Sequence, residues 1–282
     1  MEKRRLYALR RSSGLCDTPW MTFVLIAAAL YLLAAALLFR RLRDLGPTMP
    51  ATFWLTPVAA VSVHSTAHLV AWHAAGGANL HFFSALSLVG LGMAMLTVLV
   101  GLRGRMAALG VIVFPIAAIV AALYGWVGRQ DPQTLDWRLQ LHAWCALLAY
   151  ATLAVASVLA LLLLAQERAL RQRRLHGWLR ALPPLIELET LLFRTITVGF
   201  ILLSATLLTG VLFVENLMAQ HLAHKTLLSV LSWLTFGALL LGRWRYGWRG
   251  VKAVRWTLAA MGLLILAFFG SQAVLELILH RR

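Results

Sequence analysis

Two histidines, His64 and His68, lie four residues apart in a stretch that otherwise has the composition of a membrane-spanning helix. Residues four apart share one face of a helix, so the two imidazoles point the same way. Neutral imidazole binds metal ions and haem iron, and it also accepts and donates hydrogen bonds. The pair therefore has three interpretations: a shared metal site, a haem ligand beside a group that bonds a propionate or helix backbone, or hydrogen bonds between helices.

The residues around these histidines are aliphatic and aromatic, which suits a flat hydrophobic cofactor better than a bare metal ion. The aromatic ones are Trp54, Trp72, Phe82, Phe83 and Trp144. The two cysteines, Cys16 and Cys145, form no CxxC or CxxCH motif, so the chain is neither a thiol oxidoreductase nor itself a c-type cytochrome. The sequence also has no Walker, GxSxG or HExxH motif.

The composition of the chain is that of a membrane protein. Of its 282 residues, 61% are hydrophobic and 13% are charged, against about 45–50% and 25% in soluble domains. The apolar residues fall in blocks of about 20, the length that crosses the hydrocarbon core of a bilayer. We therefore predict an all-α bundle of eight transmembrane helices, over 20–39, 51–73, 83–102, 107–127, 141–165, 195–215, 225–242 and 256–279.

The basic residues are unevenly distributed between the loops. Loops 40–50, 103–106, 166–194 and 243–255 hold 16 Lys and Arg residues, and the opposite connecting loops hold three. Short basic loops stay in the cytoplasm, so we expect both termini in the periplasm of a bacterial inner membrane. The net charge of +16 is then explained by basic loops that orient the protein in the membrane and contact anionic lipid. Nucleic-acid binding is not expected.

Two segments do not follow the simple pattern. Residues 1–20 carry five basic residues that this topology would translocate, so we treat them as a separate extension, with Met21 as an alternative start, and 21–282 as one domain. The stretch 166–194 is too polar to span the membrane. After the prolines at 183–184 it resumes with apolar residues at helical spacing, and we expect a short amphipathic helix on the cytoplasmic surface. An orienting basic loop is the alternative.

This topology gathers the histidines at the outer face. Only His176 of the nine histidines is cytoplasmic. The outer ones are His64, His68, His73, His81, His142, His221, His224 and His280. The orientation was fixed without them, so the cluster is an independent indication of an outer site.

Parts of the second half resemble a known family. The segment LHAWCALLAYATLAVASVLALLLLAQERALR from residue 141 is similar to one in the CcsA/HemX/YpjD family, membrane proteins that handle haem in cytochrome c assembly. LPPLIELETLLFRTITVGFILLSATLLTGVLF and the pattern K-x(3)-S-x(3)-W-x(14)-WRG, from Lys225 to Gly250, also resemble it. The likeness covers roughly residues 21–280 and is greatest to the small YpjD branch.

The resemblance implies an eight-span protein that binds haem b near the outer face and works with cytochrome c maturation or haem-biosynthesis proteins. His142 matches a haem-ligating outer histidine of the family, His64 matches a histidine of the YpjD branch, and His280 lies near a second outer histidine. The sequence departs from the family in the intramembrane histidine of the penultimate helix, whose position is Leu241 here, and in one outer loop. The tryptophan-rich loop of haem delivery is replaced by VENLMAQHLAHK before Lys225, which favours an accessory or regulatory haem-binding protein over a complete haem lyase.

These observations lead to one expected site and two alternatives. We expect His142 and His64 to flank one haem pocket and to ligate the iron, with His68 beside a propionate and His224 and His280 as further candidates. The protein would bind and present haem without catalysing bond formation itself. The alternatives are a transporter of a small solute or metal with His64 and His68 in its path, and a membrane anchor that binds a partner complex through 166–194.

Overall fold

The computed structural model describes residues 19–44, 51–77, 80–102, 107–127, 136–173, 182–213 and 220–270. Within these ranges the chain is helical and contains no strand. The long helices are α2 (Pro19–Asp44), α3 (Leu55–Ala75), α4 (Phe82–Gly101), α5 (Ala107–Val127), α6 (Trp137–Arg171), α7 (Leu185–Phe213), α8 (Gln220–Tyr246) and α9 (Gly250–Ile265). A short 3-10 turn, η1 (Ala51–Trp54), precedes α3, and a π-helical turn, η3 (Leu266–Gly270), follows α9.

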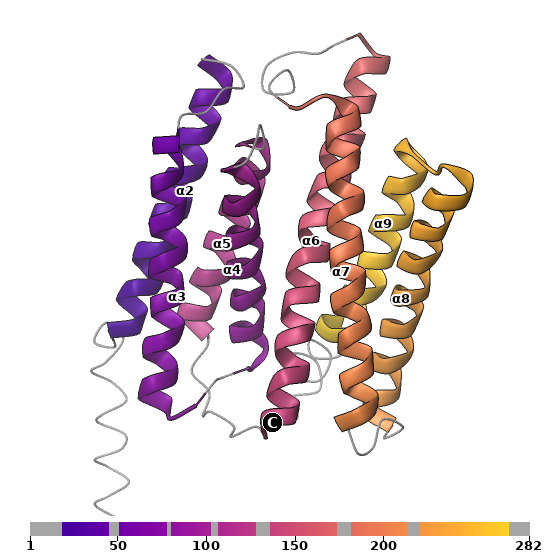
Figure 1. The fold of residues 1–282 in the computed structure, drawn as a ribbon. Helices are drawn as coiled ribbons and strands as arrows, with labels where there is room; N and C mark the ends of the chain where they lie inside the picture. The colour runs from indigo at the N-terminus through magenta and orange to yellow at the C-terminus, as the bar shows by residue number, and fades with distance from the viewer. Residues whose placement is uncertain are drawn as a thin grey trace, which may run out of the picture.

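Consecutive helices run in opposite directions along one common axis (Figure 1). The C-terminal ends of α2, α4, α6 and α8 therefore lie at one end of the bundle, the upper end in Figure 1. These are the helix ends that precede the basic loops in the sequence. The N-terminal end of α2 and the C-terminal end of α9 lie toward the opposite side.

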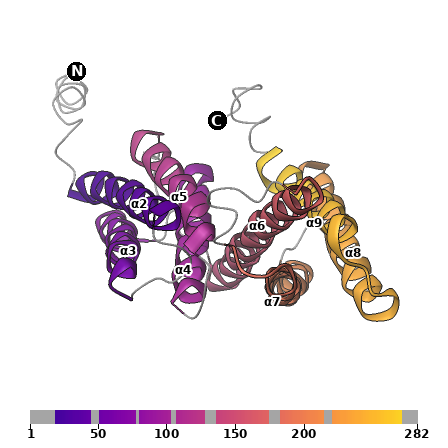
Figure 2. The same ribbon diagram turned by 90° about the horizontal axis from the view of Figure 1, so that it is seen from above.

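The bundle is divided into two halves of four helices. Seen along the axis, α2 to α5 form one group and α6 to α9 form the other (Figure 2). The two groups meet mainly where α4 packs on α6. A Cβ atom on Gly92 of α4 would lie 2.8 Å from the Cβ of Ala151 on α6, so a glycine is needed for this close approach. We call this contact between α4 and α6 the seam.

Seven helices in the described ranges are long and apolar enough to cross a membrane. The predicted span 107–127 coincides with α5, and most of the others are longer than predicted because their arginine-bearing ends continue as helix, as at Arg171 of α6. The helix that is not among the seven is α3, whose polar residues include His64 and His68. It nevertheless lies beside α2 and packs against it over its length (Figure 1).

The separate amphipathic helix expected within 166–194 is not found among the described residues. Residues up to Arg171 extend α6, and residues 185–194 are the first turns of α7, which continues unbroken to Phe213. The part of this stretch at 174–181 lies outside the described residues. Helix α7 can carry a buried acid in its first turns, Glu189, which is only 4% exposed. Its carboxylate forms ion pairs with Arg243 near the end of α8 and with Arg249 just before α9.

The α8–α9 turn contains the WRG residues of the sequence pattern. Gly247 and Gly250 both have positive φ, at 65° and 57°, which favours glycine. The indole of Trp248 folds back onto Gly242, where a Cβ would approach it to 2.4 Å. Arg249 then reaches Glu189. The WRG sequence is thus explained by this turn, which ties α8 and α9 to the start of α7.

Candidate functional site

His64 and His68 lie inside the first half of the bundle. Their side chains are 0% and 2% exposed. The two rings are stacked, with centroids 5.3 Å apart, as expected for residues one helical turn apart. His68 also stacks on Tyr124 of α5, at 4.7 Å between ring centroids. The pair therefore belongs to a closed polar core formed by α2, α3, α4 and α5.

Both imidazoles share one hydroxyl group. Ser87 Oγ, on α4, lies 2.9 Å from Nε2 of His64 and 3.1 Å from Nε2 of His68. Nδ1 of His64 has a second partner, the hydroxyl of Tyr31 on α2, at 3.3 Å. The single Ser87 proton can serve at most one Nε2, so at least one of the two Nε2 atoms carries a proton and donates to Oγ. Both Nε2 atoms are thus engaged with Ser87.

Two buried nitrogens next to this cluster have no hydrogen-bond partner in the described part of the chain. They are Nδ1 of His68 and Nε1 of Trp72. The two rings are 6.0 Å apart, and Trp72 in turn contacts Trp144 of α6 edge-on at 5.5 Å. This aromatic contact connects the histidine pair of the first half with the start of the second half.

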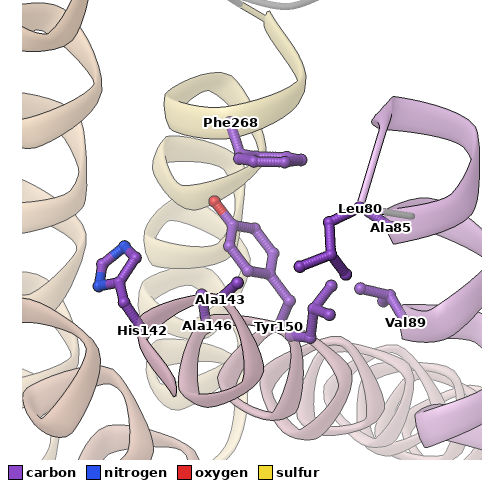
Figure 3. A pocket seen from close by; sticks show the side chains of 9 residues that line it. Leu80, Ala85, Val89, His142, Ala143, Ala146, Tyr150 and Phe268 are labelled. Carbon is purple, nitrogen blue, oxygen red and sulfur yellow. The ribbon is translucent and has the colours of Figure 1, made fainter. Parts of the chain in front are cut away.

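A hollow of about 150 Å³ lies at the seam. Helices α4 and α6, the η3 turn and Leu80 contribute its walls, which are mostly apolar. Its lining residues are Leu80, Ala85, Val89, His142, Ala143, Ala146, Leu147, Tyr150 and Phe268. Figure 3 shows His142 at one edge of the hollow, Phe268 beside the ring of Tyr150, and the α4 residues on the opposite side. His142 is the residue in this wall that could bind a metal centre.

The orientation of His142 is fixed by α7. Its Nδ1 lies 3.1 Å from the hydroxyl of Thr209. That hydroxyl also lies 2.8 and 3.0 Å from the backbone carbonyls of Ala205 and Thr206. With its proton on these carbonyls it accepts from an Nδ1–H of His142, and in that arrangement Nε2 keeps a free lone pair. A neutral histidine with Nδ1–H held by a second group is the form that binds metals.

Room for this imidazole is provided by a glycine. Gly210 follows Thr209 on α7, and a Cβ there would lie 3.2 Å from Cε1 of His142, tighter than an ordinary van der Waals contact. The sequence analysis identified His142 but not Thr209 or Gly210. The chain gives a weak signal for them, a hydroxyl and a glycine within an apolar stretch, and such residues are common in membrane helices.

The predicted site residues are only partly brought together. His64 and His68 are neighbours, but neither lines the hollow that His142 lines, so these residues do not form the single shared pocket that we expected. The reason is that Tyr31 and Ser87 hold His64 inside the first half. His280 lies outside the described residues, and His224 is described only as part of the backbone of α8. Among the described side chains no three His, Cys, Asp or Glu could together hold a metal ion.

The comparison with known proteins gives the family. The model of the family described as "Cytochrome C assembly protein" matches residues 56–279, which include α3 to α9. The chain belongs to this family.

The Inner membrane protein YpjD of Escherichia coli K12 is 32% identical to the chain over 204 residues, 72% of the chain and 77% of YpjD. An uncharacterized 28.8 kDa protein of Azospirillum brasilense is 38% identical over 143 residues, 50% of the chain and 53% of the relative. Protein HemX of Brevibacillus brevis is 27% identical over 134 residues, 47% of the chain and 49% of HemX. No solved structure matches the chain significantly.

Proposed function

We propose that this member of the cytochrome c assembly family binds haem at the seam, with His142 as an axial ligand, and handles haem for cytochrome c biogenesis or its regulation. The observation that carries the proposal is the place of His142, whose imidazole lines an apolar hollow while its Nδ1 is held by Thr209 of α7. Haem binding is also the role that the family resemblance implies for His142.

The donor set fits haem better than a bare ion. One imidazole is available, and no second His, Cys, Asp or Glu is found among the described residues that line the hollow. The walls include the aromatic rings of Tyr150 and Phe268. Flat apolar cofactors are held by such walls, while structural metal ions need three or four ligands. Haem iron already has four nitrogen ligands from its macrocycle, so one protein ligand is enough to hold it.

The size of the hollow adds a requirement. Its volume of about 150 Å³ is below the roughly 300–1,000 Å³ of typical ligand pockets. Haem therefore fits only if α4 and α6 lie further apart than they do here. The two-half architecture allows this, since the halves meet mainly along this seam. The proposal thus includes a small separation of the halves when haem binds.

We assign His64 and His68 a structural role. Both Nε2 atoms already bond Ser87, which favours the interpretation of hydrogen bonding between helices over haem or metal ligation. The same contacts weaken the alternative of a metal transporter with these histidines in its path. Their hydrogen bonds link α2, α3 and α4, and so hold the first half together as a unit.

We further propose an inner-membrane location with α3 as an eighth span and both termini in the periplasm. A relative carries the name inner membrane protein, and the helix ends that precede the four basic loops lie at one end of the bundle (Figure 1). With that end in the cytoplasm, His142 lies near the periplasmic end of α6. The proposed haem site would then lie toward the periplasmic side.

The test is a visible spectrum of the purified protein and of His142→Ala. We expect a Soret band in the unaltered protein, which is lost or shifted in His142→Ala while the variant still accumulates in the membrane. His64→Ala is the matched control, a buried histidine that should lower stability and leave the band of the remaining protein unchanged. A His142→Ala protein with normal haem content and an unaltered band would exclude the proposed ligand.

A further inference from the structure

A groove on the surface of the second half has no role in the proposed haem site. It lies between α8 and α9, of which α8 forms the edge of the molecule furthest from the first half (Figure 2). Its volume is about 280 Å³, and its lining residues are Thr235, Arg255, Trp256 and Ala259. Both helices are among those long and apolar enough to cross a membrane. An arginine in the wall of a groove between them requires an explanation, because charged side chains are costly in lipid.

Arg255 has no acidic partner in the described part of the chain, and its side chain is exposed. Its neighbours at the same end of the bundle differ in this respect. Arg243 and Arg249 both pair with the buried Glu189, and Lys252 lies 3.7 Å above the ring of Trp248. The guanidinium of Arg255 is therefore a positive charge that needs water or an external anion to compensate it.

The level of Arg255 in the membrane follows from the helix geometry. It is the sixth residue of α9, which begins at Gly250, so it lies about 7–8 Å along the helix from its start. Trp244 and Tyr246, at the end of α8, are 82% and 73% exposed, as expected for aromatic residues at the membrane–water interface. Arg255 thus lies just inside the aromatic belt, within reach of lipid phosphate groups.

We propose that this groove binds one anionic phospholipid. The phosphate lies on the guanidinium of Arg255, whose fork of N–H donors matches phosphate oxygens. The indole of Trp256 packs on the glycerol region, and one acyl chain follows the groove past Ala259 toward Thr235. Nearby basic residues without a described acidic partner, Arg245 and Lys252, favour anionic over zwitterionic lipid through their longer-range field.

The experiment is native mass spectrometry of the full chain, released from mixed vesicles of phosphatidylglycerol and phosphatidylcholine with identical acyl chains. We expect one retained phosphatidylglycerol in preference to phosphatidylcholine. Arg255→Gln should weaken its retention about fivefold, the effect of one basic residue on an anionic lipid. Arg245→Gln removes the same charge from the same end but lies outside the groove, so it should change retention much less. Equal losses in the two variants would show a general charge effect and overturn the site.

The acyl-chain part of the proposal is tested by Ala259→Leu, which narrows the groove without changing any charge. Ala259 is exposed, so the larger side chain disturbs no packed core. We expect weaker retention of phosphatidylglycerol and a smaller preference for phosphatidylglycerol over phosphatidylcholine. Retention equal to that of the unaltered protein, or displacement of the lipid by inorganic phosphate alone, would contradict a groove that holds a lipid by both headgroup and chain.

Discussion

The hydroxyl of Thr209 lies 3.1 Å from Nδ1 of His142 and joins α7 to α6 by a hydrogen bond. The same hydroxyl lies 2.8 Å from the carbonyl of Ala205, and with its proton there it accepts from Nδ1. The bond then favours one tautomer and one orientation of the imidazole. Thr209 is therefore a positioning residue for the proposed ligand, although it does not itself line the hollow.

Thr209→Val should weaken haem binding without removing the ligand. The valine has the same shape but cannot accept the Nδ1 proton, so the ring is free to rotate and to change tautomer. Loss of such a second-shell partner typically costs about 10- to 100-fold in metal affinity, measurable by haem titration at the Soret band. Thr209→Ser should retain most of the affinity. Thr197→Val, which removes an α7 hydroxyl bonded only to the carbonyl of Phe193, is the control and should bind haem normally.

Ser87→Ala should lower the stability of the first half. The substitution leaves Nε2 of His64 and of His68 buried with no hydroxyl partner, and an unsatisfied buried polar group costs about 1–3 kcal/mol. The free energy of unfolding in detergent would measure this loss. Ser157→Ala is the matched control, since that buried hydroxyl bonds only its own helix, at the carbonyl of Leu153. If Ser87→Ala were as stable as Ser157→Ala, the histidine pair would not depend on Ser87.

Two glycine substitutions should have opposite effects. Gly242→Ala places a methyl group within 2.4 Å of Trp248, and such overpacking costs about 1–3 kcal/mol. Gly262→Ala meets nothing within 4 Å and gains helix propensity, so it should be neutral or stabilising. Thermal unfolding of both variants in the same detergent checks the sign. A stable Gly242→Ala protein would show that the α8–α9 turn can move away from α8.

The proposed orientation predicts the location of the C-terminus. A reporter that is active only after export should be active when fused after Arg282, because eight alternating spans with cytoplasmic basic loops place that end in the periplasm. A second reporter, active only in the cytoplasm, should be active in loop 103–106. The reverse pattern would place His142 near the cytoplasmic end of its helix and remove the site from the side of cytochrome c maturation.

The sequence predicted the helices well because hydropathy responds to each residue alone. The start of α7 was missed for the same reason: Glu189 indicates a polar surface until its partners Arg243 and Arg249 are known, and these are more than 50 positions away in the chain. A charged residue in a helix therefore does not indicate by itself whether it is exposed or is buried in an ion pair.

The candidate site was predicted less completely. Histidine chemistry and the family resemblance identified His142, and the spacing of His64 and His68 correctly placed both rings on one helix face. Their separation from His142 could not be predicted, because it depends on which helices pack together. Ser87 and Tyr31, which decide what the histidine pair bonds, are ordinary residues for a membrane helix and give no signal of their own.

The division into two halves has a consequence for synthesis of the protein. The main contacts of α2, α3, α4 and α5 are with one another, apart from the α4–α6 seam, and all four helices precede α6 in the chain. The first half can therefore assemble in the membrane while the ribosome is still translating the second, in keeping with N-terminal units that fold first during synthesis. The seam surface of α4 would then remain uncovered until α6 is synthesised. The hollow beside His142 would therefore be the last part of the protein to form.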